Sequence, residues 1–336
     1  MTHQYNFRPS TRLFFPNGLS QSSSGPSFVC RAEKYVYLFF LACAATNPPE
    51  GRLYEKCCAL LAGADIQFRR SNRLDIALST NMNIALIFLP AADIPTFVGE
   101  GKCDLGITGL DQVKEADMFD SVADLLDLEF GKCKLQVQVP ANGDIDKPEQ
   151  LVGKKIVSSF TRLSSKYFEE LEKQVGHEQG ATKIKFVGGS VEASCALGVG
   201  DAIVDLVESG ETMKAAGLKA ISTVLETSAH LISSRKPRFP DIVQTVHQRF
   251  EGIMAAQRFV LCNYNAPRSI VPEVLKITPG KRAATISALE NVSADSEPWV
   301  AISSMVEKKK ISDVMDELKK AGASDILVFD INNCRV

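Results

Sequence analysis

The sequence carries almost no excess of charge of either sign. Its 38 Lys and Arg residues face 40 Asp and Glu residues, which leaves a formal net charge of −2 at pH 7. Proteins that bind nucleic acid or anionic membranes concentrate positive charge on one face. The composition therefore gives no electrostatic support for nucleic acid or a membrane as a partner.

The sequence also lacks the residue patterns of several common sites. Its nine Cys residues are an odd number with scattered spacings, which fit neither a disulfide framework nor a zinc site. We expect reduced, buried thiols in a cytoplasmic protein, and no protein-built metal site. The four His residues form no recognisable Ser/His/Asp or Cys/His arrangement, and we expect His230 to be structural.

No apolar run is long enough to cross a bilayer. The best candidate, residues 35–45, is too short and lies behind a polar leader, so it fits neither a membrane span nor a signal peptide. We interpret it as a buried strand. Residues 1–29 are rich in Ser and Pro, which favours disorder, and we treat residues 1–46 as a separate N-terminal segment.

The remaining chain alternates short apolar runs with helical patterns. A length of 336 residues with 45% apolar residues suits two or three globular domains. Alternation of this kind predicts an α/β fold with mostly parallel sheets. The predicted strands are residues 66–68, 74–78, 84–89, 103–108, 135–139, 155–158, 184–187, 202–207, 223–225 and 230–232. The predicted helices are residues 53–61, 92–99, 164–173, 191–197 and 213–216.

The last third of the chain predicts a βαββαβ unit. Asp241 is expected to cap an amphipathic helix that precedes it. Strands are predicted at residues 258–264, 283–289, 299–306 and 326–331, and helices at 269–275 and 312–321. This is the order of a ferredoxin-like domain. From the fold alone, this domain is as well explained as an assembly module without a ligand as it is as a regulatory domain.

The most informative motif is the stretch from Gly200 to Thr212. An apolar run ends in an acidic turn with a glycine, and a helix follows. Free N–H groups at a helix start suit a phosphate, and Gly210 allows a close approach of the backbone. The turn consists of Glu208, Ser209, Gly210, Glu211 and Thr212. Asp205 and Glu208 could bind ribose hydroxyls or a metal-chelated diphosphate. The alternatives are that Asp205 only caps or pairs, that Glu208 is solvated, and that Thr212 is only a helix cap.

Two more glycine-bearing segments lie at the ends of predicted strands. One contains Asp104, Thr108 and Gly109, and the other contains Gly189, Ser190 and Glu192. In open α/β sheets, ligands bind at such strand ends. Together with Gly51-Arg52-Leu53 and residues 73–77, which begin with Arg73, these motifs closely resemble the long form of the ATP phosphoribosyltransferase family. The resemblance runs from about Gly51 to Val336.

The resemblance implies a two-lobed core like that of type II periplasmic binding proteins, followed by a regulatory domain. It places lobe I at residues 47–136 and 224–240, lobe II at 137–223 and the C-terminal domain at 241–336. It implies transfer of phosphoribosyl from phosphoribosyl diphosphate to N1 of ATP, the first step of histidine biosynthesis. Mg²⁺ would arrive with the diphosphate.

The resemblance also assigns roles to the site residues. Residues 208–212 would hold the 5-phosphate, and Asp205 would orient the ribose. Arg52 and Arg73 would face the charge of ATP or diphosphate. The opposite wall would contain Asp104, Thr108, Gly109, Gly189, Ser190 and Glu192.

One departure from the family pattern leaves a second class open. Pro49 and Glu50 stand where the family carries two lysines, so two cations beside a polyphosphate are missing. The alternative is a weakly active or inactive relative that only binds a ligand or only regulates. The intact Asp205 and Thr212 favour the enzyme.

The resemblance finally implies inhibition by histidine. Its pocket would contain Asn265, Thr285 and Asp325, with Thr285 bonded to the ligand. Asn265 stands where relatives often carry Asp. Thr285 could also be a strand residue chosen for β-propensity. The expected assembly is a homo-hexamer in equilibrium with a dimer.

Overall fold

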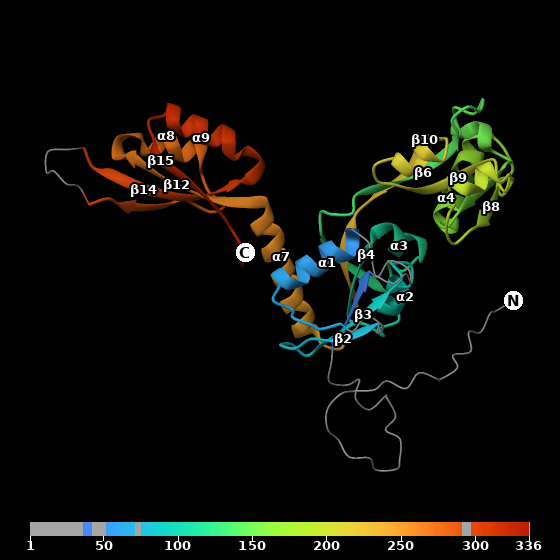
Figure 1. Cartoon of the computed structure of the whole chain (residues 1–336), viewed down its shortest axis with the longest axis horizontal. Coiled ribbons are helices and arrows are strands. Elements are labelled where there is room, and N and C mark those ends of the chain that lie inside the picture. Colours follow the sequence, from blue (N-terminus) through green and yellow to red (C-terminus); the bar gives the residue numbers. More distant parts are fainter. Residues whose placement is uncertain (1–35, 42–51, 71–74, 291–296, 336) are drawn as a thin grey trace, which may run out of the picture. The chain divides into compact units, whose positions relative to one another are not determined.

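The structure is a computed structural model of the chain, and its strands form three sheets. It describes residues 36–41, 52–70, 75–290 and 297–335, with the backbone alone at residues 36–41, 52 and 53. Among the described residues, the sheets have six, five and four strands. Figure 1 colours the chain from its N-terminus to its C-terminus. We call the units built on these sheets lobe I, lobe II and the C-terminal domain.

Lobe I contains the six-stranded sheet, in the order β2-β3-β1-β4-β11-β5. Strand β1 lies in the middle and pairs in parallel with β3 and β4, whereas β11 is antiparallel to both β4 and β5. The predicted border at residues 46/47 is therefore wrong, because it leaves this central strand outside lobe I. Its strands are β1 (Val36–Leu41), β2 (Ile76–Leu78), β3 (Ile84–Leu89), β4 (Leu105–Gly109), β5 (Val122–Asp127) and β11 (Ala229–Ser234), and its helices are α1 (Arg52–Gly63), α2 (Ile94–Gly99) and α3 (Leu110–Glu115).

Lobe II repeats this arrangement in the order β10-β6-β9-β7-β8. Strand β7 pairs in parallel with β8 and β9, and β6 is antiparallel to β9 and β10. Its strands are β6 (Cys133–Pro140), β7 (Lys155–Ser158), β8 (Lys183–Phe186), β9 (Ala202–Val207) and β10 (Leu218–Thr227), and its helices are α4 (Thr161–Val175), α5 (Ala193–Ala196) and α6 (Glu211–Ala215). In each lobe, three parallel strands are extended by two strands that adjoin the crossings, and lobe I adds β2, antiparallel to β3, at its far edge. Both sheets are therefore mixed, and the prediction of mostly parallel sheets is wrong. The predicted two-lobed α/β core is nevertheless confirmed.

The chain crosses between the lobes twice, once after β5 and once after β10. Strands β6 and β10 pair with each other along their length, from Pro140 and Leu218 to Cys133 and Thr227. The predicted lobe borders at residues 136/137 and 223/224 fall inside these two strands. The backbone pairing places both whole strands in lobe II, so the crossings lie at residues 128–132 and at Ser228.

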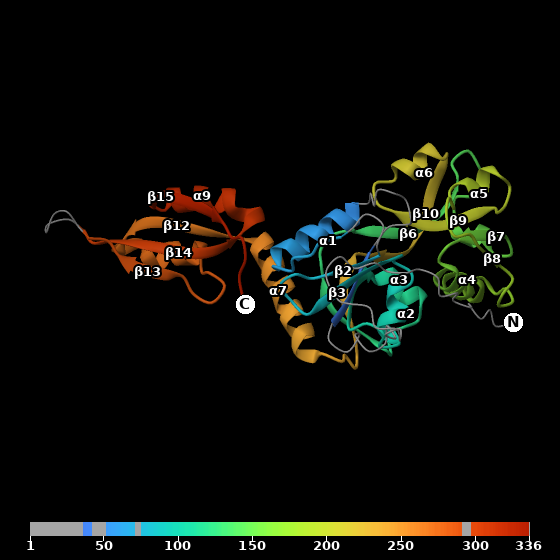
Figure 2. The ribbon, with the colours of Figure 1, turned by 60° about the horizontal axis from the view of Figure 1, so that its bottom comes forward.

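The C-terminal domain is an antiparallel sheet in the order β13-β14-β12-β15. Helices α8 and α9 lie on one side of it (Figures 1 and 2), and burial alternates along β12 and β14 because one face packs on these helices. The elements are β12 (Phe259–Pro267), α8 (Val271–Ile277), β13 (Thr285–Ala288), β14 (Trp299–Glu307), α9 (Ile311–Lys320) and β15 (Ser324–Asp330). The predicted βαββαβ order is confirmed.

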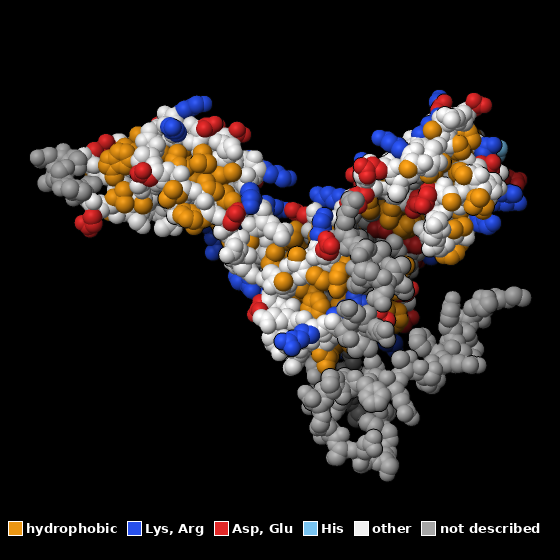
Figure 3. All heavy atoms as spheres, viewed as in Figure 1, with side chains coloured by type: hydrophobic (Ala, Val, Ile, Leu, Met, Phe, Trp, Pro, Cys, Tyr) orange, Lys and Arg blue, Asp and Glu red, His pale blue; other side chains and the backbone are white. Residues whose placement is uncertain are grey.

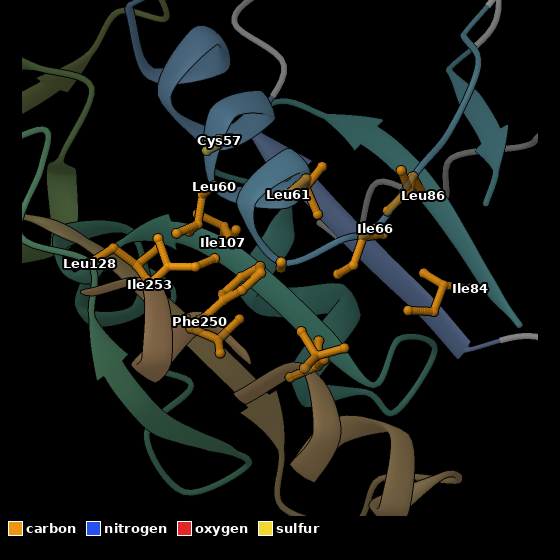
Figure 4. Packing of buried hydrophobic residues seen from close by; sticks show 14 of the residues in the cluster. Cys57, Leu60, Leu61, Ile66, Ile84, Leu86, Ile107, Leu128, Phe250 and Ile253 are labelled. Atoms are coloured by element: carbon orange, nitrogen blue, oxygen red, sulfur yellow. The ribbon is translucent and has the colours of Figure 1, made fainter. Parts of the chain in front are cut away.

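Helix α7 (Pro240–Arg258) packs into the core of lobe I. Phe250 and Ile253 lie among Leu60 of α1 and Ile107 of β4 (Figure 4). The prediction that Asp241 caps this helix is wrong. The cap position is Phe239 with Pro240 at the first helical turn, because proline fixes φ for a helix start. The predicted domain border at residue 241 thus falls at a helix whose apolar side belongs to lobe I.

Three smaller predictions differ from the structure. Residues 66–68 form no strand but make a single bridge, between Phe68 and Ser79. Strand β5 and helix α3 were not predicted, because a six-residue element of mixed polarity leaves a weak periodic pattern. Helix α6 begins at Glu211, two residues before the predicted start.

A buried carboxylate closes the loop after α4. Glu172 is 1% exposed and accepts hydrogen bonds from the backbone N–H groups of Gly180 (2.7 Å) and Thr182 (2.6 Å). Burial alone would raise the pKa of Glu172. The hydrogen bonds from Thr182 and its neighbours outweigh that effect and hold the pKa below the usual 4.5.

The lowered pKa gives a stability prediction with a definite sign. The stabilisation is present above the unfolded-state pKa and is lost as the pH falls through the folded-state pKa. We expect Glu172→Gln to lower the free energy of unfolding by about 1.5–3 kcal/mol at neutral pH, because hydrogen bonds to a charged group are lost. Urea unfolding at neutral pH and below 4.5 measures this. Glu170→Gln, an exposed position of the same helix, is the control. A difference that stays constant as the pH falls would contradict the prediction.

Candidate functional site

The carboxyl ends of three parallel strands meet at one edge of lobe II. Strands β7, β8 and β9 run in the same direction, so the loops that follow them lie at this edge. Ligands of α/β sheets bind at such edges. The predicted residues that this edge brings together are Gly189, Ser190, Glu192, Asp205, Glu208, Ser209, Gly210, Glu211 and Thr212.

Asp205 lies in the second half of β9, where its carboxylate accepts a hydrogen bond from the N–H of Leu206 (2.8 Å). The side-chain amide of Gln138 donates to the Asp205 carbonyl (3.3 Å). Burial raises the pKa of Asp205, and the nearby negative charge of Glu192 raises it further. Asp205 and Glu192 therefore form a pair of acidic side chains at the lobe II edge, able to bind hydroxyl groups or a cation that arrives with a substrate.

The loop before α6 has the backbone that the sequence suggested. Gly210 adopts φ +78°, a left-handed conformation that favours glycine, and it is the residue that precedes the helix. Thr212 is therefore not the helix cap; it lies one residue inside the helix, with its side chain exposed. The N–H groups of the first helical turn have no acceptor within the helix. The N–H of Glu211 donates to the Ser209 hydroxyl (3.4 Å), and the other N–H groups of this turn are available to an anion together with the Thr212 hydroxyl.

The turn between β8 and α5 forms the neighbouring part of the edge, so Gly189, Ser190 and Glu192 lie in lobe II with residues 205–212. The prediction that they share one wall with Asp104, Thr108 and Gly109 is wrong, because those three belong to lobe I. Ser190 has φ +49°, and no atom lies within 4 Å of where a Cβ on Gly189 would be. Glu192 stands directly before α5 and makes no side-chain cap. The turn thus leaves open space beside Gly189.

The site residues predicted in lobe I lie at two opposite ends of strand β4. Thr108 and Gly109 end β4 at its carboxyl edge, and the Thr108 hydroxyl donates to the Ala91 carbonyl (2.9 Å). Asp104 precedes β4 at the opposite edge, is 1% exposed, and accepts bonds from Arg238 Nη2 (2.7 Å) and its backbone N–H (2.7 Å). The structure does not bring Asp104 together with the other predicted site residues. Its neighbours make it a structural partner of Arg238.

Sequence reasoning missed Asp111, which lies beside Gly109. This carboxylate is 3% exposed, accepts a hydrogen bond from the Thr227 hydroxyl (2.8 Å), and its burial raises its pKa. A Cβ on Gly109 would lie 2.1 Å from Asp111 Oδ1, so glycine is needed there for close approach. Burial, with Asp111 and Glu208 as negative neighbours, raises the pKa of the Cys133 thiol to about 12. The only available sequence signal was the glycine two positions before an acid at a strand end.

A hydrogen-bonded row of Ser228, His230 and Asp124, which no sequence pattern indicated, lies at the crossing. His230 Nδ1 lies 2.9 Å from Asp124 Oδ1, and Nε2 lies 3.1 Å from the Ser228 hydroxyl. However, Ser228 is buried and donates its hydroxyl to Asp127 (2.9 Å). A serine held in this way is not presented as a nucleophile. The row therefore agrees with the expected structural role of His230.

Four predicted positions lie outside the described side chains. They are Pro49, Glu50, Arg52 and Arg73. Within the described parts of the chain, no three or more His, Cys, Asp or Glu residues gather as metal ligands, and no helix there is long and apolar enough to span a membrane.

The C-terminal domain contains a cavity of about 250 Å³ on the sheet face opposite α8 and α9. It is lined by all three residues predicted for histidine, Asn265, Thr285 and Asp325. The Asn265 amide donates to the Asp325 carboxylate (2.9 Å), and Asp325 has φ +50°. Apolar side chains are also exposed in this domain (Figure 3), including Leu327 and Phe329 on β15. The sheet thus brings together residues that lie 60 positions apart.

The fold defines a two-lobed α/β protein with an additional βαββαβ domain. Its candidate site is the acidic, glycine-containing edge of lobe II. Comparison with known families narrows this class. The ATP phosphoribosyltransferase family matches residues 90–252, and the C-terminal domain of the same family matches residues 256–333. The chain is 77% identical over 289 residues to the ATP phosphoribosyltransferase of Debaryomyces hansenii, covering 86% of this chain and 95% of that protein. The chain belongs to the ATP phosphoribosyltransferase family.

Other relatives agree. The ATP phosphoribosyltransferases of Candida albicans and Saccharomyces cerevisiae are 72% and 62% identical, each over 86% of this chain and 95% of the relative. Among solved structures, the ATP phosphoribosyl transferase (HisG:HisZ) complex from Thermotoga maritima has a TM-score of 0.49 and 23% identity, covering 63% of this chain and 92% of that one.

Proposed function

We propose that this chain transfers phosphoribosyl from phosphoribosyl diphosphate to N1 of ATP and releases diphosphate. The bond from C1 of the ribose to diphosphate breaks as the bond from C1 to N1 forms, with inversion at C1. The observation that carries the proposal is the 77% identity to an ATP phosphoribosyltransferase over 95% of its length. The reaction is the first step of histidine biosynthesis, and we place it in the cytoplasm.

The lobe II edge supplies a geometry for this reaction. The first-turn N–H groups of α6, the Gly210 backbone and the Thr212 hydroxyl would bind the 5-phosphate, with Glu208, Ser209 and Glu211 completing the loop. Asp205, next to Glu192, would orient the ribose hydroxyls. Arg52 and Arg73 would meet the charge of ATP or diphosphate. Positioning and electrostatics would supply most of the rate enhancement, because the leaving diphosphate carries its own charge.

Magnesium would enter with phosphoribosyl diphosphate as part of the substrate. Mg²⁺ keeps several waters and typically binds phosphate oxygens with one or two carboxylates. Asp205 and Glu192 at the lobe II edge fit that requirement.

One assay separates this function from the alternative of an inactive, ligand-binding relative. The purified chain is incubated with ATP, phosphoribosyl diphosphate and Mg²⁺, and both phosphoribosyl-ATP and diphosphate are measured. Formation of both products in equal amounts supports the transferase. Binding of either substrate without any product would favour the inactive relative.

We further propose that histidine inhibits the enzyme through the C-terminal cavity. Thr285, Asn265 and Asp325 line that cavity with hydroxyl, amide and carboxylate groups that suit an amino acid. Inhibition from a separate domain requires two global states with different affinity for histidine. We expect a homo-hexamer in equilibrium with a dimer, shifted toward a compact hexamer by histidine.

Thr285→Ala is expected to weaken histidine binding and relieve inhibition while uninhibited turnover stays the same. Loss of one hydrogen bond in the cavity should raise the dissociation constant about tenfold, since such a bond contributes roughly 0.5–1.5 kcal/mol or more with a charged partner. Isothermal titration of both proteins with histidine checks this. Ile286→Ala, its exposed neighbour on β13, is the control. Equal affinity of wild type and Thr285→Ala for histidine would show that Thr285 does not bind histidine.

A further inference from the structure

Helix α3 belongs to lobe I but is bonded to lobe II at both of its ends. At its start, Asp111 accepts a hydrogen bond from the hydroxyl of Thr227, the last residue of β10 (2.8 Å), and its backbone N–H donates to the same hydroxyl (3.1 Å). At its end, Glu115 reaches the first turn of α4. This short helix therefore connects the two lobes beside their crossings.

The contact of Glu115 with α4 is specific in geometry. Its two carboxylate oxygens accept separate hydrogen bonds, from the N–H of Arg162 (2.8 Å) and from the N–H of Leu163 (2.9 Å). The Thr161 hydroxyl lies 3.4 Å from the first oxygen. These N–H groups have no acceptor inside α4, and a helix start favours negative charge. A side chain of one lobe thus caps a helix of the other.

The two ends of α3 differ in how easily they can separate. Asp111 is buried and also accepts a bond from Gln112 (3.1 Å), whereas Glu115 is only half-buried. If Glu115 moves away from α4, water can bind both the N–H groups of α4 and the Glu115 carboxylate. The Asp111 contact lies at the crossing, where a change in the angle between the lobes would move it little. The Glu115 contact is therefore the one that can open and close.

The place of the contact connects it to the substrates. The first turn of α4 directly follows β7 at the carboxyl edge of lobe II, and α3 directly follows β4 at the carboxyl edge of lobe I. Substrates bound to the two edges react only when these edges are held at a fixed distance. We propose that Glu115 is a positioning residue for the transfer, which caps α4 and so holds the two lobes in the reactive arrangement.

The proposal predicts the same loss for both substrates. Because Glu115 acts through its hydrogen bonds to α4 in this proposal, Glu115→Ala should lower kcat/KM for ATP and for phosphoribosyl diphosphate by one common factor. We expect roughly ten- to a hundredfold, the effect of losing hydrogen bonds to a charged group. Glu115→Gln keeps one acceptor oxygen at the right distance and should recover part of the loss. A change confined to the KM of one substrate would overturn the proposal, because it would place Glu115 on that substrate.

A second measurement uses the protein without substrates. Hydrogen exchange should become faster at the Arg162 and Leu163 amides in Glu115→Ala, and small-angle scattering should give a larger radius of gyration. The kinetic measurement rests on the proposed transferase function, whereas these two do not. Unchanged exchange and scattering would overturn the proposal even if the enzyme proved inactive.

A neighbouring ion pair provides the matched control. Asp117 pairs with Arg162, but both side chains are more than half exposed, and such pairs contribute little. Asp117→Ala also removes a negative charge near the start of α4, yet it should leave kcat/KM, exchange and scattering close to wild type. Equal effects of Asp117→Ala and Glu115→Ala would show that charge alone matters and would overturn the specific cap. Thermal unfolding of each variant confirms that it is folded.

Discussion

A Gly210→Val variant is expected to lose about a hundredfold in kcat/KM for phosphoribosyl diphosphate. Gly210 has φ +78°, and a β-branched residue in that conformation costs roughly 1–3 kcal/mol. Relief of this strain would turn the N–H groups of α6 away from the phosphate, with the loss of charge-assisted hydrogen bonds worth about 1.5–3 kcal/mol. The dissociation constant for ATP should change much less, because the loop serves the other substrate.

Thr212→Ala tests the same loop without backbone strain. Its exposed hydroxyl is removed while the helix start is kept, and we expect about a tenfold weaker binding of phosphoribosyl diphosphate. Steady-state kinetics with each substrate varied in turn measures both variants. Gly217→Val is the control for strain, since Gly217 has φ +70° just after the far end of α6. Equal losses for ATP and phosphoribosyl diphosphate, or a loss in Gly217→Val as large as in Gly210→Val, would contradict the assignment of the loop.

The second large effect concerns stability. Phe250→Ala is expected to lower the free energy of unfolding by about 3–5 kcal/mol, as is usual when a buried aromatic side chain leaves a cavity. Phe250 is fully buried, and it lies on α7 between α1 and the lobe I sheet (Figure 4). The variant should therefore weaken lobe I, although α7 directly precedes the C-terminal domain in the sequence.

Hydrogen exchange with peptide resolution can locate that effect. Amides of α1 and β4 should exchange faster in Phe250→Ala, whereas amides of β12 and β14 should stay protected. Phe329→Ala, at an exposed position of β15, is the control and should change neither. Loss of protection in β12 and β14 with none in lobe I would instead assign α7 to the C-terminal domain.

Much of the fold could be predicted because its signals are local. The strands at residues 84–89, 155–158 and 202–207 were predicted with the bounds that the structure has, since continuous apolar runs between turn residues identify buried strands. The βαββαβ order of the C-terminal domain followed from the same kind of pattern. Elements with weak patterns, such as α3 and β5, were not predicted, although both adjoin the crossings between the lobes.

The sequence predicted the lobe II part of the candidate site better than the lobe I part. The loop at residues 208–212 could be recognised because its glycine, its acids and its helix start are consecutive in the sequence. Asp104 was grouped with Thr108 and Gly109 for the same reason, and there the grouping failed. Thr108 and Gly109 are the last two residues of the five-residue strand β4, whereas Asp104 precedes its first residue and so lies at the other edge of the sheet. Nearness in sequence predicts nearness in a turn, but the ends of a strand lie far apart.

The sequence by itself determined the two-lobed α/β class, the C-terminal domain, the family and the position of the phosphate-type loop, because each depends on residues within one element or turn. Only the tertiary structure decided which residues join the lobes. Asp111 and Thr227 are 116 positions apart, and Glu115 and Arg162 are 47 apart. No local preference brings such pairs together. Their contacts exist because burial of the lobe cores fixes the sheets, and the sheets then place α3 between the crossing and α4.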